Sequence, residues 1–345
     1  MEIGNQIKTL RLRRGITQDA LAQHLGVTPQ AVSKWERNAA APDIEMLPAL
    51  SAYFGVTIDE LFAISDDTRM ERIQNMLWDV RFISPAEEDA AREFLLEKSK
   101  REPGNGKPHA LLAQMENHIA DSYHSRAEEY AKEALRREPR LKMAHSELVE
   151  AMKGVSGDWC HDNHYALIEY YKDFVRENPD YVSGYLWLIE QLVDDKRTKD
   201  AWEYWEKAEK LDSTCRIPFY KVLILMEEGK TTEAMDCLRK MQEDFGDDWL
   251  TWLSSGDALA RMGKYEDAKS CYRKYLGLQS APRYTDGCSA TAQICQIQGD
   301  FAGAIEATRE EINLLASDWD TTTGETVEQF RRKIAELEKK LANQN

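Results

Sequence analysis

Small side chains recur along most of this sequence at a nearly constant interval. The clearest unit lies between Trp252 and Tyr272, where two predicted helices are joined at Gly263. Its first helix carries a small residue between two large ones, and its second helix carries Ala268 between two aromatic residues. With Ala268 as the reference, the equivalent positions follow one another at intervals of 33 to 40 residues: Ala91, Ala127, Leu167, Ala201, Ala234 and Ala304. A period of this length predicts stacked helical hairpins, because a small residue lets two helix axes approach closely.

This unit resembles the tetratricopeptide repeat (TPR), and the resemblance implies an α-solenoid. Glycines at the predicted turns keep the same spacing, at Gly229, Gly263 and Gly299. We therefore predict about seven hairpins over residues 66–323, the first three irregular and the one around Leu167 interrupted by an insertion at 154–164. Residues 324–345 contain a last helix with apolar residues spaced alternately by three and four. That helix is expected to cap the solenoid, although such a stripe can instead pair two chains.

Residues 16–37 contain the signals of two short helices separated by a tight turn. Thr17 and Thr28 are expected to cap these helices, and each follows an apolar residue that can pack against the first turns of its helix. Gly26 ends the first helix. Pro29 occupies the first position of the second helix, where its missing N–H is tolerated. The stretch therefore predicts a helix-turn-helix.

The second of these helices has two unlike faces. Val32 and Trp35 can pack against the first helix, while the opposite face carries polar, mostly long side chains: Gln30, Ser33, Lys34 and Arg37. Such a face suits the major groove, because Gln can bond an adenine edge through two hydrogen bonds and Lys reaches guanine acceptors or phosphates. The alternative is a solvated helix face. The doubled capping pattern favours DNA binding over that alternative.

Residues 3–63 resemble the Cro/cI-type (XRE-like, lambda-repressor-like) helix-turn-helix domain, a five-helix bacterial DNA-binding module. The resemblance rests on two stretches, IKTLRLRRGITQDALAQHLGVTPQAVSKWERN and PDIEMLPALSAYFGVTIDELF. It implies an all-α chain with a DNA-binding head at residues 1–65. It also implies an ion pair between Arg11 of the first helix and Glu36, which follows the aromatic residue of the recognition helix.

The same resemblance assigns the DNA contacts. Gln18 would bond a phosphate, and Arg37 and Asn38 would follow the strand as it leaves the groove. Four residues would face bases or backbone: Thr28, Gln30, Ser33 and Lys34. Pro29 stands where some relatives have a base-reading amide side chain, so Gln30 is expected to carry more of the specificity.

Charge is divided unequally along the chain. Residues 1–38 hold six basic and three acidic side chains, whereas the whole chain carries a net charge of −16. A basic tip on an acidic body favours local DNA contact and keeps the body away from phosphates. The sequence shows no signal peptide, no apolar run of membrane-spanning length and, among six cysteines, no CxxC pair. We expect a cytoplasmic protein with reduced thiols and no membrane partner.

The solenoid is expected to bind through its concave wall, lined by the first helix of each hairpin. Six positions on this wall are the candidate ligand contacts: Glu190, Asp194, Phe219, Glu227, Asp257 and Arg261. An acidic wall with apolar interruptions favours a peptide or partner segment of mixed basic and apolar character. The alternative is a solvated face whose charge serves solubility.

Signals for other chemistry are weak. Cys160, His161 and His164 lie close together beside Asp158 and Asp162, but their spacing matches no closed zinc pattern. The sequence has no phosphate-binding glycine loop and no GxSxG or HExxH motif, and its histidines 109, 118, 124 and 145 have no nucleophile at a fixed offset. We therefore expect neither an enzyme nor a bound cofactor or metal.

Together these features predict a bacterial transcriptional regulator that binds operator DNA as a homodimer and receives a peptide or protein signal through its solenoid. The order of the domains resembles the peptide-pheromone receptors of bacteria, the RRNPP group, which implies a secreted peptide that returns to the cell as ligand. A different possibility is a TPR interaction scaffold whose head no longer binds DNA. The intact face formed by Gln30, Ser33 and Lys34 argues against that possibility.

Overall fold

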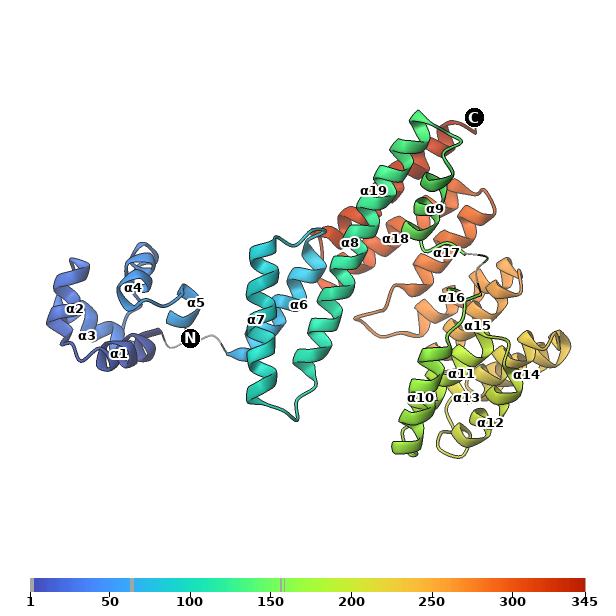
Figure 1. Cartoon of the computed structure of the whole chain (residues 1–345), viewed down its shortest axis with the longest axis horizontal. Helices are drawn as coiled ribbons and strands as arrows, with labels where there is room; N and C mark the ends of the chain where they lie inside the picture. The colour runs from blue at the N-terminus through green and yellow to red at the C-terminus, as the bar shows by residue number, and fades with distance from the viewer. Residues whose placement is uncertain (1–2, 63–64, 156, 158, 345) are drawn as a thin grey trace. The chain divides into compact units, whose positions relative to one another are not determined.

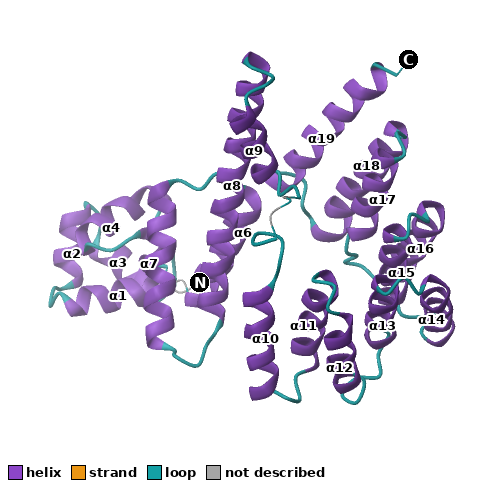
Figure 2. Ribbon diagram, turned by 45° about the vertical axis from the view of Figure 1, so that its right-hand side comes forward, coloured by secondary structure: helices purple, strands orange, loops and turns teal. Residues whose placement is uncertain are grey.

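The computed structural model of the chain describes residues 3–62, 65–155, 157 and 159–344. Helices joined by turns and loops make up this described part, which contains no strand (Figures 1 and 2). None of its helices is both long and apolar enough to cross a membrane. The chain forms two compact units, residues 1–123 and 124–345, and each is described by itself. The predicted all-α class, with a helix-turn-helix head followed by TPR-like hairpins, is confirmed.

Five short helices form the head at the start of the first unit. These are α1 (Ile3–Arg13), α2 (Gln18–Leu25), α3 (Pro29–Glu36), α4 (Leu47–Phe54) and α5 (Ile58–Leu61), with a 3-10 turn at Ile44–Met46 before α4. Each helix contributes one side chain with no exposed surface to a single core: Ile7, Leu21, Val32, Leu50 and Leu61. Pro48 lies in the first turn of α4, where its missing N–H is tolerated.

Three further helices complete the first unit: α6 (Asp66–Asp79), α7 (Pro85–Arg101) and α8 (Lys107–Arg137), which continues into the second. Met70, Phe94, Leu95 and Leu111 join them through a small apolar core. Ser84 caps α7 by accepting a hydrogen bond from the backbone N–H of Glu87, whose carboxylate accepts one from the Ser84 N–H in return. This reciprocal capping box explains where α7 begins.

Two of the predicted repeat positions are wrong. The hairpin expected around Ala127 does not form, because no glycine or proline interrupts residues 109–137 and α8 continues through them as one helix. Leu167 was placed at an inward position, but its side chain is 42% exposed, whereas its neighbour Ile168 is fully buried. A one-residue shift rotates a helix by about 100°, so the register drawn from regular repeats fails in α10.

The second unit begins with the end of α8, α9 (Lys142–Ala151) and α10 (Tyr165–Glu177). Four regular hairpins follow: α11 (Val182–Asp194) with α12 (Thr198–Ala208), α13 (Arg216–Glu227) with α14 (Thr231–Asp244), α15 (Trp249–Arg261) with α16 (Tyr265–Leu278), and α17 (Asp286–Ile297) with α18 (Phe301–Trp319) (Figure 2). The predicted small residue of each is completely buried: Ala201, Ala234, Ala268 and Ala304. The register is therefore confirmed across these four hairpins.

The four hairpins share one turn geometry. In each, a residue with positive φ follows the first helix, and the next backbone N–H donates to a carbonyl five residues earlier at 2.8–2.9 Å. Glycine occupies the left-handed position in three turns, as predicted, at Gly229, Gly263 and Gly299. Lys196 adopts the same conformation, with a φ of 64°, in the first turn. The hydrogen-bond pattern satisfies helix-end carbonyls and so stops each first helix at the same place.

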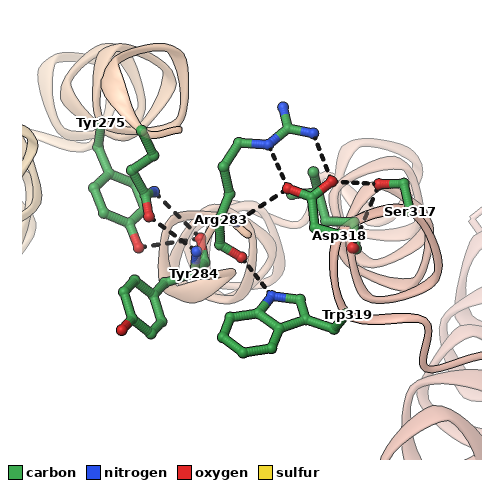
Figure 3. Close-up of polar contacts among 8 residues, drawn as sticks. Tyr275, Arg283, Tyr284, Ser317, Asp318 and Trp319 are labelled. Atoms are coloured by element: carbon green, nitrogen blue, oxygen red, sulfur yellow. Dashed lines mark hydrogen bonds and ion pairs between the residues drawn. The ribbon is translucent and has the colours of Figure 1, made fainter. Parts of the chain in front are cut away.

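A longer connection between α16 and α17 is tied to the end of α18 (Figure 3). The guanidinium of Arg283 donates to both carboxylate oxygens of Asp318, at 2.7 and 3.0 Å, and its backbone N–H donates to the same group. The Trp319 indole N–H donates to the Arg283 carbonyl at 2.7 Å, and the Tyr275 hydroxyl donates to the Tyr284 carbonyl at 3.1 Å. The hydrogen bonds from Arg283, together with one from the Ser317 hydroxyl, lower the pKa of Asp318 well below its usual range. The cluster is internally satisfied and holds the third hairpin to the fourth.

The last helix, α19 (Glu325–Ala342), packs against α18. Leu337 is buried with Ile305, and Ile334 and Leu341 pack against the same cluster. The apolar stripe is thus used within the chain, which supports a capping role for residues 324–345.

We expect Gly256 to be essential to the packing of the third hairpin. A Cβ at this position would lie 2.4 Å from Cε1 of Tyr272, so Gly256→Ala should destabilise the fold by about 1–3 kcal/mol. Gly277→Ala is the control, because no atom lies within 4 Å of its Cβ position, and it should be neutral or slightly stabilising. Urea unfolding of the full chain, followed by circular dichroism, measures the free energy of unfolding of both variants. Equal unfolding midpoints for the two variants would contradict the packing described here.

Candidate functional site

Helices α2 and α3 form the predicted helix-turn-helix. The hydroxyl of Thr17 accepts a hydrogen bond from the Ala20 N–H at 3.1 Å, and that of Thr28 accepts one from the Ala31 N–H at 3.2 Å. Gly26 ends α2 with a φ of 68°, a left-handed conformation that glycine adopts without strain. Both predicted caps and the predicted stop are confirmed, and the turn between the helices is short and defined.

A buried ion pair holds α3 in place. Nε and Nη2 of Arg11 in α1 donate to the two carboxylate oxygens of Glu36, at 2.5 and 2.8 Å, and both residues are more than 90% buried. Arg11 Nη1 also donates to the carbonyl of Ile16, directly before α2. Burial alone would raise the pKa of Glu36, but hydrogen bonds from Arg11 and Gln18 lower it overall. The pair therefore connects all three helices on which the candidate DNA interface depends.

Gln18 has a different partner from the one that the resemblance implied. Its side-chain N–H donates to Glu36 at 2.7 Å, so the amide completes the ion pair. Gln18 lies in the first turn of α2, where backbone N–H groups also face outward. The side-chain NH2 of Gln18 carries a second N–H, and its predicted role in bonding phosphate stays a prediction.

Side chains on the outward face of α3 are exposed, as contact with DNA bases requires. Gln30 and Lys34 are exposed, and their side chains have no hydrogen-bond or ion-pair partner among the described residues. Ser33 is half-buried beside them, and its carbonyl accepts a hydrogen bond from Nε of exposed Arg37 at 3.1 Å. These four side chains form a continuous polar surface, while Val32 and Trp35 are buried on the opposite side. We call this surface the α3 face.

Two other predicted contact residues have structural roles. Thr28 is exposed, but its hydroxyl caps α3. Asn38 has a φ of 54°, and its side chain accepts a hydrogen bond from the Gly4 N–H and donates one to Asn5. Gly4 allows this close approach, because a Cβ there would overlap the carbonyl of Trp35. Asn38 thus joins the start of α1 to the end of α3, a long-range contact that no local motif reveals.

Three of the four carboxylates predicted on the acidic wall are bonded to side chains of the protein itself. Glu190 accepts a hydrogen bond from the Tyr220 hydroxyl, Glu227 pairs with Lys196 at 2.9 Å, and Asp257 accepts one from the Tyr272 hydroxyl at 2.8 Å. Burial raises the pKa of Asp257 above its ordinary value despite that hydrogen bond. Asp194 and Arg261 are exposed.

Phe219 is the one member of the predicted set that lines a hollow on this wall. The first hollow, of about 370 Å³, lies across α11, α13 and α15 and includes Ser183, Leu186, Trp187, Arg216, Phe219, Tyr220, Leu250 and Ser254. A second hollow, of about 570 Å³, also contains Arg216 and Leu250 and extends to Val182, Trp249, Asp248 and the loop at 211–214. Because they share two residues, the hollows are adjacent. We call them together the solenoid groove.

Repeat spacing could have revealed the groove. Ser183, Arg216 and Leu250 are separated by 33 and 34 residues, and so are Trp187, Tyr220 and Ser254. These are the intervals between Ala201, Ala234 and Ala268, so each triplet occupies one equivalent position in three repeats. The predicted ligand contacts lie mainly on the later turns of the first helices, whereas the groove lies over their first turns.

Among the described residues, the metal-capable side chains of the insertion do not form a metal-binding cluster. Asp158 lies outside the described residues, and within the rest of the described chain no three His, Cys, Asp or Glu side chains are placed to hold one ion. His164 Nδ1 lies 2.8 Å from Asp195, whose carboxylate also accepts the His164 backbone N–H. This contact fixes the start of α10.

Comparison with known sequences matches the head. The helix-turn-helix family profile (HTH_3) matches residues 7–61. The HTH-type transcriptional activator BcrR of Enterococcus faecalis is 41% identical over 63 residues, which are 18% of this chain and 31% of BcrR. An uncharacterised HTH-type transcriptional regulator of Methanocaldococcus jannaschii is 32% identical over 63 residues, 96% of its length. The chain thus spans about a third of the first relative and nearly all of the second.

Solved structures show more distant likeness. A tetratricopeptide repeat protein from Parabacteroides merdae covers 79% of this chain and 98% of its own, with 13% identity and a TM-score of 0.40. Bacillus thuringiensis PlcR, in complex with the peptide PapR7 and DNA, covers 91% of this chain and 99% of its own, with 13% identity and a TM-score of 0.29.

We predict that Glu36→Gln weakens the whole head. The substitution keeps the side-chain shape but leaves the buried Arg11 guanidinium without a counter-charge, a loss of about 3 kcal/mol or more. Hydrogen exchange of the full chain should then accelerate throughout α1 and α3. Glu45→Gln, in an exposed position of the same head, is the control and should leave exchange unchanged.

The same pair predicts a pH dependence. Because the folded-state pKa of Glu36 is lowered, its contribution to stability is complete above the ordinary glutamate pKa of about 4.3 and is lost as the pH falls below it. Wild-type exchange in α1 and α3 should rise in acid more steeply than that of Glu36→Gln. Parallel pH profiles for the two proteins would show that the ion pair does not stabilise the head.

Proposed function

Because the chain belongs to the helix-turn-helix family of transcriptional regulators, we propose that it is a sequence-specific DNA-binding regulator whose solenoid responds to a peptide or protein partner. The observation that carries the DNA-binding part is the α3 face. Its long polar side chains are exposed and unpartnered at Gln30 and Lys34, while Arg11 and Glu36 hold the helix beneath them. A rigid helix with free donors and acceptors on one side is what major-groove reading requires.

We propose a division of labour within the α3 face. Gln30 lies in the first turn of α3, one residue after Pro29, and an amide there can bond an adenine edge. Arg37 follows the end of α3 and is placed to contact phosphate. Lys34 can serve either purpose. Ser33 and Thr28 contribute hydroxyls at the edge of the surface.

The proposed domain division follows from these assignments. Residues 1–65 form the DNA-binding head, residues 66–323 the TPR-like solenoid, and residues 324–345 the capping helix. The solenoid groove supports the partner-binding part of the proposal, because it is lined by several apolar side chains that a solvated wall would not need, including a Trp187 ring that is 43% exposed.

We also propose that the protein acts as a homodimer on a two-fold operator. One head of this size contacts a single half-site, and affinity against genomic competitors is normally reached with two half-sites about 34 Å apart. The apolar stripe of α19 is packed against α18, so the dimer contact belongs elsewhere on the solenoid.

Gln30→Ala should weaken binding to the true operator by about 1–3 kcal/mol and change binding to scrambled DNA little. Arg37→Ala should weaken binding to both duplexes and reduce the salt dependence by about one phosphate contact. Salt titrations of each variant with operator and scrambled duplexes separate the two effects. If Gln30→Ala weakened both duplexes equally, Gln30 would not be a base reader.

The dimer proposal predicts paired protection of the operator. Footprinting should show two half-sites with their centres about one helical turn apart, and sedimentation should show a dimer at the same protein concentration. The DNA-bound dimer places two heads on one face of the duplex, so inserting five base pairs between the half-sites should strongly reduce affinity. A single unpaired half-site bound by a monomer would contradict the proposal.

A further inference from the structure

Among the described residues that line the solenoid groove, one is basic and has no ion-pair partner. Arg216 is the first residue of α13 and the only basic residue that lines either hollow. Its side chain is exposed, and within the described chain its guanidinium has no hydrogen-bond or ion-pair partner. Arg261, on the last turn of α15, lies outside both hollows. An unpartnered guanidinium in a partly apolar groove is a ready site for a carboxylate.

Two carboxylates, those of Asp212 and Asp248, line the second hollow, and each accepts hydrogen bonds from the protein. Asp248 accepts a hydrogen bond from the Leu250 N–H at 2.9 Å, and Asp212 accepts one from the Thr214 N–H at 3.0 Å, so both stabilise the starts of local turns and helices. Glu190 is held by the Tyr220 hydroxyl. The first hollow therefore offers an unpaired cation with no acidic residue in its lining, while the carboxylates of the second hollow accept hydrogen bonds from the protein itself.

Apolar side chains surround Arg216 on both sides. In the first hollow, Trp187, Phe219 and Leu250 present partly exposed rings and methyl groups. In the second, Trp249 and Val182 do the same. Burial of such groups by a ligand is favourable by about 25 cal/mol for each Å² removed from water.

The position of Arg216 favours an acidic side chain within the bound peptide over the carboxylate at the end of a peptide. Arg216 and Leu250 line both hollows, so the cation lies where the two join. A segment that fills both hollows passes Arg216 within its length and has residues on either side of it. A terminal carboxylate bound at Arg216 would leave one hollow empty.

We propose that the solenoid groove binds an extended peptide segment with an internal Asp or Glu side chain on Arg216 and apolar residues on both sides of it. This inference rests on the proposed function and refines it by naming the charge of the ligand. It also reverses the expectation from the sequence, in which the acidic wall favoured basic segments. Three carboxylates of that wall, Glu190, Glu227 and Asp257, are bonded to side chains of the protein itself.

Peptide arrays provide the test. Cellulose-bound nonapeptides, acetylated at the free end, carry Glu, Gln or Lys at the centre and random apolar residues around it. The labelled full-length protein is applied, and the best sequences are remeasured in solution by fluorescence anisotropy with amidated and free C-termini. The variants are Arg216→Glu and the matched control Arg261→Glu, both at exposed positions where folding should be unaffected.

Glu-centred peptides should bind about tenfold more tightly than their Gln counterparts, because the ion pair is partly desolvated. Amidation of the C-terminus should have no effect. Arg216→Glu should abolish the preference for Glu and create one for Lys, whereas Arg261→Glu should retain the wild-type preference. Circular dichroism of each variant confirms that the fold is intact.

Equal binding of Glu, Gln and Lys peptides would overturn the inference, as would a loss of binding on amidation or the same change in Arg261→Glu. The proposed function would survive these results if peptides of another charge still altered operator affinity. If no peptide bound while operator binding remained sequence-specific, the groove assignment alone would be wrong. Loss of sequence-specific operator binding would instead count against the proposed regulator.

Discussion

The close crossing of two helices at a small residue is the constraint on which the solenoid depends. Ala201, Ala234, Ala268 and Ala304 are completely buried, one in each regular hairpin, and Gly256 brings the α15 backbone against the ring of Tyr272. A larger side chain at such a point would move the two helix axes apart. The next hairpin would be displaced as well, because each repeat contacts its neighbours directly. The spacing of the groove residues follows from the same register, so the binding surface depends on the packing behind it.

The head is organised around a different interaction. Its apolar core is small, with one fully buried side chain from each of five helices, and the Arg11–Glu36 pair adds a polar contact inside it. Buried ion pairs do not by themselves add much stability, but they penalise every arrangement in which the partners are separated. Here the pair orients α3 relative to α1 and to the start of α2. The position of the α3 face is therefore specified by chemistry on the opposite side of the helix.

Local signals predicted more of this structure than long-range ones. Caps, glycine stops and the alanine register are encoded by neighbouring residues, and they located the helix-turn-helix and the four regular hairpins. The hairpin predicted at Ala127 was wrong. The repeat interval was kept there, but no glycine or proline lies between 109 and 137 to end the helix. The side chains of Asn38 and Gln18, which the resemblance assigned to DNA, also bond Gly4 and Glu36, partners 34 and 18 residues away that no local pattern predicts. Three carboxylates of the predicted acidic wall likewise have long-range partners, because Glu190 and Asp257 accept hydrogen bonds from tyrosine hydroxyls and Glu227 pairs with Lys196.

We propose above all that this chain recognises a particular DNA sequence through its head. Selection of duplexes from a random pool by the full-length protein, followed by sequencing of the bound fraction, tests it most directly. The account predicts that repeated rounds enrich one reproducible motif, with affinity for that motif at least about a thousandfold above that for the starting pool. Bound sequences that remain as varied as the input, with equal affinity for motif and pool, would contradict it.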